Sequence, residues 1–151
     1  MAAKWLRRHE NITTYREVLQ LPDNDFLELA WTELPTPKSN KPIIIILHGL
    51  EGSVDSHYAK GMLQALKDRG WIGVLMHFRG CGQHPNKLGR SYHSGDITDI
   101  SYLVSLLERR YPEQKKAIIG FSLGGNVLTN YLAKVTTHNI KAGVVICAPL
   151  D

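Results

Sequence analysis

The chain has 151 residues, of which 43% are hydrophobic and 21% charged, an ordinary composition for one globular domain with a core. Its net charge of +4 comes from scattered lysines and arginines, so the composition does not favour a nucleic-acid-binding surface. Two cysteines, Cys81 and Cys147, provide no disulfide framework, and no apolar run is long enough to span a bilayer.

The first part of the chain predicts an antiparallel hairpin. Residues 13–21 and 26–32 roughly alternate between apolar and polar side chains, and the Pro-Asp-Asn-Asp sequence between them favours a turn. Residues 34–42 contain three prolines, which cannot donate to a strand ladder, so we expect a loop there.

From residue 43 onward, short strands alternate with helices. The predicted strands are mostly apolar runs at residues 43–47, 71–76, 117–119 and 143–148. Between them, apolar side chains recur at helical spacing, and the three predicted helix faces are Ala59, Met62, Leu63 and Leu66; Ile97, Ile100, Val104 and Leu107; and Val127, Leu128, Tyr131, Leu132 and Val135. This βαβαβαβ order predicts an α/β fold with a parallel sheet and helices on both faces.

Residues that favour helix ends flank two of these helices. Asp55 or Ser56 is suited to cap the first helix, and Gly70 is placed to end it. Asp96 and Asp99 lie in the first turn of the second helix, where negative charge complements the helix dipole.

The stretch I-I-G-F-S-L-G-G-N at 118–126 joins a predicted strand to a predicted helix. Ser122 lies between Gly120 and Gly124 in a G-x-S-x-G frame. A sharp turn there exposes the serine hydroxyl, and small residues are needed because the turn brings backbone segments together. This arrangement is typical of enzymes that transfer acyl groups through a serine nucleophile.

Such a serine needs donors for the oxyanion that forms during attack. We expect one donor to be the backbone N–H of Leu123, directly after the serine. The other is expected in the loop after the strand at 43–47, where the N–H of Leu50 is the best candidate. The alternative is that His48 and Gly49 only form a tight strand exit.

Five stretches together resemble the YheT-like branch of the alpha/beta-hydrolase superfamily: H-G-L-E-G-S at 48–53, S-H-Y-A-K-G at 56–61, H-F-R-G-C-G at 77–82, R-S-Y-H-S-G at 90–95 and G-F-S-L-G-G-N at 120–126. The resemblance implies hydrolysis of carboxylic esters by a Ser-Asp-His triad with Ser122 as the nucleophile. One difference is that His77 stands where the family often has asparagine.

The remaining triad members have no clear match in the sequence. In this fold the acid and the histidine usually follow later strands than the one at 143–148. His138 falls in the connection between helix and strand, so we expect a surface residue and not the base. Asp151 is a candidate acid because it lies just beyond a strand, although the alternative of a loop residue is favoured.

We therefore expect residues 1–151 to form a single, incomplete domain corresponding to the N-terminal half of the hydrolase, with little turnover alone. The alternative is a non-catalytic binding module or truncated product that retains the scaffold. The strand at 143–148 is apolar on both faces but has no later strand beside it, so we expect an exposed edge that self-associates or recruits a partner.

No metal or cofactor is expected. His77, Cys81, His84 and His93 surround a glycine-rich loop, but their spacing matches no structural zinc pattern. Arg79 is expected to pair with Asp96 beside the serine turn. The expected partner is a small-molecule ester, with acyl or lipid esters included, and not nucleic acid. Without an apolar signal region or a transmembrane segment, a cytoplasmic location is expected, with peripheral membrane association left open.

Overall fold

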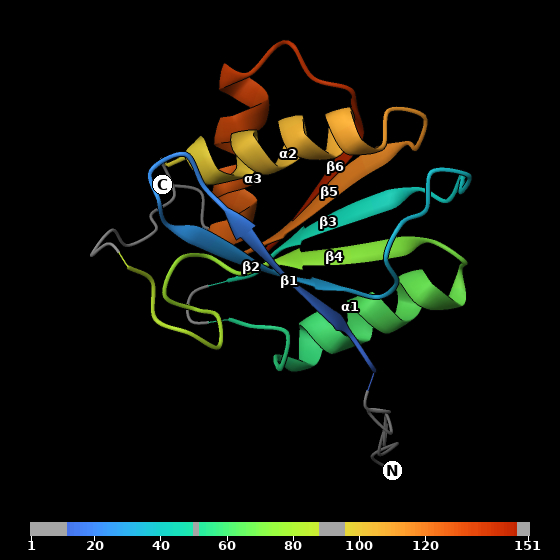
Figure 1. Cartoon of the computed structure of the whole chain (residues 1–151), viewed down its shortest axis with the longest axis horizontal. Helices are drawn as coiled ribbons and strands as arrows, with labels where there is room; N and C mark the ends of the chain where they lie inside the picture. Colours follow the sequence, from blue (N-terminus) through green and yellow to red (C-terminus); the bar gives the residue numbers. More distant parts are fainter. Residues whose placement is uncertain (1–11, 50–51, 88–95, 148–151) are drawn as a thin grey trace.

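The computed structural model describes residues 12–49, 52–87 and 96–147. Within these ranges, three helices lie on the two faces of a six-stranded sheet (Figure 1). The strands are β1 (Tyr15–Gln20), β2 (Phe26–Trp31), β3 (Ile43–Leu47), β4 (Ile72–Met76), β5 (Lys116–Phe121) and β6 (Ile140–Ile146). The helices are α1 (His57–Asp68), α2 (Thr98–Arg110) and α3 (Leu123–Lys134). The predicted hairpin and the predicted alternation of strands and helices are both confirmed.

The strands lie in the order β1-β2-β4-β3-β5-β6. β3 is central and pairs in parallel with β4 and β5, and β5 pairs in parallel with β6. The N-terminal hairpin extends the same sheet, because β2 pairs antiparallel with β4. This arrangement brings the carboxyl ends of β3, β4 and β5 to one edge of the sheet, which is where ligands bind in open α/β sheets.

The all-apolar sequence of β3 follows from helices that cover both of its faces. Ile43, Ile45 and Leu47 belong to a buried cluster with α2 and α3, whereas Ile44 and Ile46 belong to a second cluster with α1. Figure 1 shows α2 and α3 on one side of the sheet and α1 on the other. Each such side chain contributes roughly 1.5–3 kcal/mol through burial.

Two boundaries differ from the predicted ones for reasons of pairing and turn geometry. α3 begins at Leu123, directly after Ser122, so the helix includes the polar and glycine residues that precede its apolar face. β6 begins at Ile140, because its ladder with β5 starts at Lys116 and continues past a bulge. Backbone pairing, and not hydrophobicity, sets where β6 begins.

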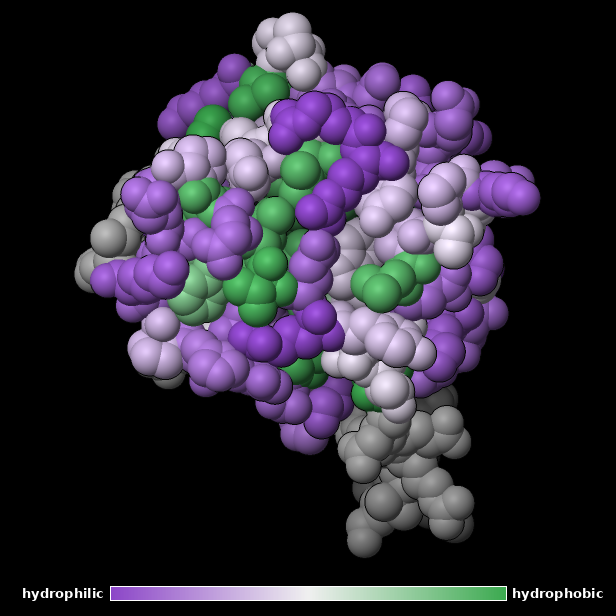
Figure 2. Space-filling model, viewed as in Figure 1, coloured by the Kyte–Doolittle hydropathy of each residue, from purple (hydrophilic) through white to green (hydrophobic). Residues whose placement is uncertain are grey.

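β6 is the edge strand of the described sheet, as predicted. Val144 and Val145 are 49% and 44% exposed, although their sequence is typical of an interior strand. On the face shown in Figure 2, hydrophobic residues form an irregular band near the middle, with hydrophilic residues around it. None of the helices in the described ranges combines the length and apolarity required to cross a bilayer.

Candidate active site

Ser122 occupies a strained turn between β5 and α3. Its φ of 51° and ψ of −116° are rare for a residue with a side chain, and such a conformation costs about 1–3 kcal/mol. Three backbone hydrogen bonds hold it: the Ser122 N–H donates to Ile146 O at 2.8 Å, and Ser122 O accepts from Gly125 N–H at 2.9 Å and Asn126 N–H at 3.2 Å. The sharp turn that the G-x-S-x-G frame predicts is therefore present.

The glycines on either side of Ser122 allow the backbone to pack closely. A methyl group on Gly120 would lie 2.5 Å from Gly124 O. A methyl group on Gly124 would lie 2.6 Å from His48 O, at the end of β3. A side chain at Gly120 would therefore push the start of α3 away from β5, and a side chain at Gly124 would push it away from the end of β3.

The loop after β3 lies directly beside Ser122. A methyl group on Gly49 would be 3.3 Å from Ser122 Cβ and 3.7 Å from the Tyr58 hydroxyl oxygen. The Gly49 N–H donates to that hydroxyl at 2.8 Å, and the Tyr58 ring packs on Phe121 with centroids 4.7 Å apart. Tyr58 of α1 thus connects the loop after β3 with the residue before the serine, a role that its sequence did not reveal.

The structure describes one of the two predicted oxyanion donors, Leu123, and not the other, Leu50. Leu123 is the first residue of α3, and in the described part of the chain its N–H has no acceptor, as is usual for the first turn of a helix. Leu50 and the candidate acid Asp151 lie outside the described residues. Their roles stay predictions.

Two buried histidines stand at the ends of β3 and β4. His48 Nδ1 donates to Gly49 O at 2.6 Å, and His48 Nε2 accepts the Phe78 N–H at 3.0 Å. His77 Nδ1 donates to Glu28 O at 3.0 Å, and its Nε2 accepts the Val54 N–H at 3.2 Å. His48 therefore orders its loop through hydrogen bonds. Burial lowers the pKa of His48 to about 4 and also lowers the pKa of His77.

Arg79, which follows β4, is buried among carboxylates from two other elements. Its Nε and Nη2 donate to the two carboxylate oxygens of Asp99 at 2.8 Å each, and its Nη1 donates to Asp23 at 2.7 Å. Asp25 lies 3.4 Å from the same Nη1. The Asp99 hydrogen bonds, followed by those of Asp23, raise the pKa of Arg79.

The predicted pair of Arg79 with Asp96 is wrong. Asp96 Oδ1 accepts the Thr98 N–H at the start of α2 instead. Asp99, one turn further along the helix, reaches Arg79. The sequence could not separate these two aspartates, because both were predicted in the first turn, whereas α2 begins at Thr98 and includes only Asp99.

Glu28 is a buried carboxylate in the middle of β2 that the sequence analysis missed. It accepts hydrogen bonds from the backbone N–H groups of Gln83 and His84 at 2.9 Å each and from Arg16 Nε at 3.1 Å. Burial alone would raise the pKa of Glu28, but these hydrogen bonds outweigh it and lower the pKa to about 2. Its position between Leu27 and Leu29 in an apolar strand was the available signal.

Comparison with known proteins identifies the family. Residues 42–151 match the family model of the alpha/beta hydrolase fold. The chain belongs to the alpha/beta-hydrolase family and is YheT-like. It is 44% identical over 150 residues to the putative esterase YheT of Escherichia coli, covering 99% of this chain and 44% of that protein. The chain thus spans less than half the length of this relative.

Two further comparisons agree with this family assignment. The monoacylglycerol lipase of Saccharomyces cerevisiae is 31% identical over 121 residues, covering 76% of this chain and 27% of that protein. The solved esterase Pf2001 of Pyrococcus furiosus superposes with a TM-score of 0.72 at 26% identity, covering 99% of this chain and 54% of that one. The predicted fold and family resemblance are confirmed.

Three other histidines of this alpha/beta hydrolase, His84, His93 and His138, were also considered from the sequence. His84 contacts Arg16 and Glu28, and His93 lies outside the described residues. His138 precedes β6, where its Nδ1 accepts the Ile140 N–H at 3.2 Å, so it lies at the end of β6 opposite Ser122. In the part of the chain that the structure describes, no three His, Cys, Asp or Glu side chains are arranged to hold a metal ion.

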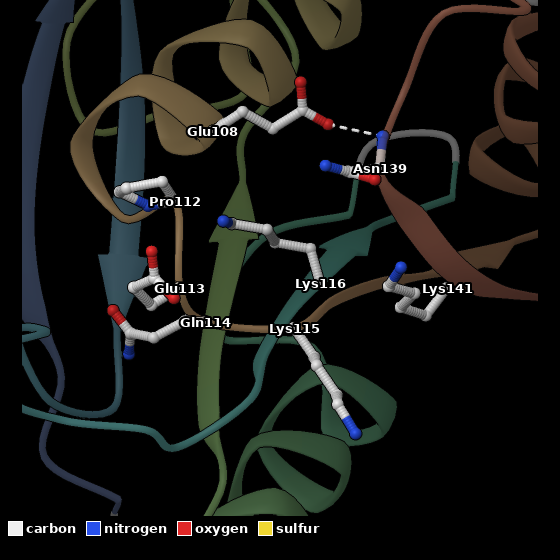
Figure 3. A pocket seen from close by; sticks show the side chains of 8 residues that line it. All are labelled: Glu108, Pro112, Glu113, Gln114, Lys115, Lys116, Asn139 and Lys141. Atoms are coloured by element: carbon white, nitrogen blue, oxygen red, sulfur yellow. Dashed lines mark hydrogen bonds between the residues drawn. The ribbon is translucent and has the colours of Figure 1, made fainter.

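A polar pocket of about 160 Å³ lies at the amino ends of β5 and β6 (Figure 3). Its lining consists of Glu108, Pro112, Glu113, Gln114, Lys115, Lys116, Asn139 and Lys141. Lys116 is buried and donates to Tyr111 O, and burial lowers the pKa of its ammonium group. Because parallel strands place their two ends on opposite edges of the sheet, this pocket is remote from Ser122.

Proposed function

We propose that this chain provides the nucleophile and the oxyanion donors of a serine hydrolase that cleaves carboxylic esters. The observation that carries the proposal is the strained Ser122 at the β5–α3 turn, packed against the loop after β3. Backbone strain of this kind persists only where surrounding contacts impose it, and it concentrates at functional sites. The esterase and lipase names of several relatives support the same reaction class.

In the proposed reaction, Ser122 Oγ attacks the ester carbonyl carbon while a general base takes its proton. The N–H groups of Leu123 and Leu50 stabilise the oxyanion of the tetrahedral intermediate. Collapse breaks the bond to the alcohol, which leaves with a proton from the protonated base. Water then hydrolyses the acyl-serine ester and regenerates the hydroxyl.

We propose that the base and its acid partner come from sequence that the longer relatives have beyond the part matched here. Within the described residues, His48 and His77 are near this end of the sheet, but both of their ring nitrogens are hydrogen-bonded to the backbone. Neither imidazole can accept a proton from Ser122 without losing such a bond. Asp151 is the alternative candidate for the acid, although a loop role is favoured for it. The chain alone is expected to turn over slowly, because loss of one triad member costs several orders of magnitude in rate.

The substrate proposed is a small ester with an acyl chain, and lipid esters are included because one relative is named a monoacylglycerol lipase. A cytoplasmic location with peripheral membrane association as the alternative fits the same proposal.

A fluorophosphonate probe tests the nucleophile directly. The longest gene product that contains this sequence should be labelled on Ser122, and Ser122→Ala should abolish labelling. Ser101→Ala, which removes a partly buried serine on α2, is the matched control and should label normally. A longer product that folds but never labels would exclude the proposed mechanism.

A second candidate function is an interaction module, favoured by the exposed edge of β6. Next to this edge, an apolar groove of about 280 Å³ lies beside α1; its apolar lining includes Ile44, Leu66, Trp71, Ala117, Ile119, Ala142 and Val144. We propose that two copies of the 151-residue chain pair through β6, because an unpaired edge with exposed valines favours strand addition. Sedimentation should show a dimer that Val144→Lys dissociates. A monodisperse wild-type monomer would contradict this pairing.

A further inference from the structure

His48 and His77 connect two loops in a reciprocal way. His48, which follows β3, accepts the backbone N–H of Phe78, which follows β4. His77, which follows β4, accepts the backbone N–H of Val54, in the segment between β3 and α1. The two rings lie 6.2 Å apart. Each loop therefore holds the other through an imidazole.

The hydrogen-bond partners determine the tautomer of both rings. A carbonyl oxygen accepts only, so the Nδ1 atoms that face Gly49 O and Glu28 O must carry the protons. A backbone N–H donates only, so both Nε2 atoms must be unprotonated. Both histidines are thus neutral, with the proton on Nδ1.

We propose that His77 is a positioning residue for the loop at 48–54, which it holds through the bond from Val54 N–H to its Nε2. The inference rests on the proposed function, because the same loop carries Leu50, the proposed oxyanion donor. His48 fixes the start of this loop to β4 and His77 fixes its end. Oxyanion donors contribute to catalysis only when they are held in place before the reaction.

The same geometry makes the loop sensitive to acid. Around His77, burial and the charge of Arg16 disfavour the imidazolium, whereas the Glu28 carbonyl and the carboxylates of Glu28 and Asp55 favour it; His48 is the neighbouring titratable ring. Protonation at Nε2 would place an N–H against the Val54 N–H. The bond must then break, and the end of the loop is released.

The lowered pKa values of the two histidines determine how the stability of the fold changes with pH. Above the ordinary histidine pKa of 6.5, the folded and unfolded chains are both neutral at these positions. As the pH falls below it, the unfolded chain takes up protons that the folded chain resists, so stability decreases with falling pH. For His48 this loss extends to about pH 4, its pKa in the folded chain.

Two substitutions separate the two bonds of His77. Glutamine places an amide oxygen near the position of Nε2, so His77→Gln retains the acceptor for Val54 N–H. Asparagine is shorter, so His77→Asn retains only the donor near Nδ1. His138→Asn is the matched control, since His138 also accepts a backbone N–H but at the opposite end of β6.

The expected readouts are local. In His77→Asn, amide exchange of Val54 should accelerate about tenfold relative to amides of α3, the effect of losing one hydrogen bond of about 1.4 kcal/mol. Fluorophosphonate labelling of Ser122 should slow by a similar factor, while His77→Gln and His138→Asn stay near wild type. Nitrogen NMR of the wild type should show that His77 is protonated at Nδ1 and unprotonated at Nε2.

Three results would each overturn the inference. The first is unchanged amide exchange of Val54 in His77→Asn, and the second is an equal loss of Val54 protection in the glutamine and asparagine variants. The third is a protonated Nε2 on His77 in the wild type at neutral pH. If His77→Asn does not fold, the wild type decides: Val54 exchange must accelerate on acidification in step with protonation of His77. If wild-type Ser122 never labels, the proposed function fails, whereas exchange at Val54 still decides the role of His77.

Discussion

The two ends of the parallel strands are organised differently. At the carboxyl ends of β3 and β4, His48, His77 and Arg79 are more than nine-tenths buried and bond to groups from other elements. At the amino ends of β5 and β6, charged side chains of both signs line a pocket, and only Lys116 among its lysines is buried (Figure 3). Buried imidazoles and a buried guanidinium thus fix the loops around Ser122, whereas among the described residues of the opposite end hydrogen bonds without a buried ion pair join segments, from Gln114 to Lys41 O and from the Asn139 N–H to Glu108.

Of the substitutions compared, removal of Arg79 should cause the largest loss of unfolding free energy. Arg79→Ala takes a buried guanidinium away from Asp23, Asp25 and Asp99 and should cost about 3–5 kcal/mol of unfolding free energy, measured by denaturant titration. Labelling of Ser122 should also decrease.

The control for this change is Arg110→Ala. Arg110 pairs with Glu17 at 2.8 Å, but both side chains are partly exposed, so its loss should cost at most about 1 kcal/mol. Equal losses of unfolding free energy in Arg79→Ala and Arg110→Ala would show that the buried Arg79 cluster stabilises the protein no more than a partly exposed ion pair does.

Gly124→Ala should have the next largest effect. The added methyl group would meet the backbone of Leu47 and His48, which cannot move without disturbing β3. Overpacking of this kind costs about 1–3 kcal/mol, and displacement of the turn should also abolish labelling of Ser122.

Gly61→Ala makes the matched comparison within α1. A methyl group there meets nothing within 4 Å, so the substitution should stabilise the protein by roughly 0.5–1 kcal/mol through helix propensity. Thermal unfolding of both variants checks the opposite signs. A Gly124→Ala protein as stable and as reactive as wild type would mean that close packing of the turn is unnecessary.

The difference between local patterns and long-range contacts also explains which features the sequence could predict. The hairpin, the alternating strands and helices and the turn at Ser122 depend on local periodicity and on glycine positions, so they were predicted closely. Glu28 was missed because its partners, Gln83 and His84, are 55 and 56 residues away and meet it only after β2 pairs with β4. Tyr58 was missed because an exposed tyrosine at a helix start carries no signal until Gly49 lies beside it.

The smallest effect is expected at the amino end, from Lys116→Met. The change removes a bond to Tyr111 O, worth about 1 kcal/mol, but also removes a buried ammonium whose pKa burial lowers. These effects oppose each other, so stability at neutral pH should change by less than about 1 kcal/mol and labelling of Ser122 should not change.

The pH dependence separates the two contributions at Lys116. Its pKa in the folded chain is below the ordinary value of 10.5, so the unfolded chain binds the proton more readily and the wild type gains stability as the pH rises toward that value. Lys116→Met lacks this gain, so the wild type should become relatively more stable between pH 7 and pH 10 in denaturant titrations. A large loss of stability or of labelling at neutral pH would show instead that the amino end also supports the geometry around Ser122, because β5 would then transmit the disturbance from Lys116 to its carboxyl end.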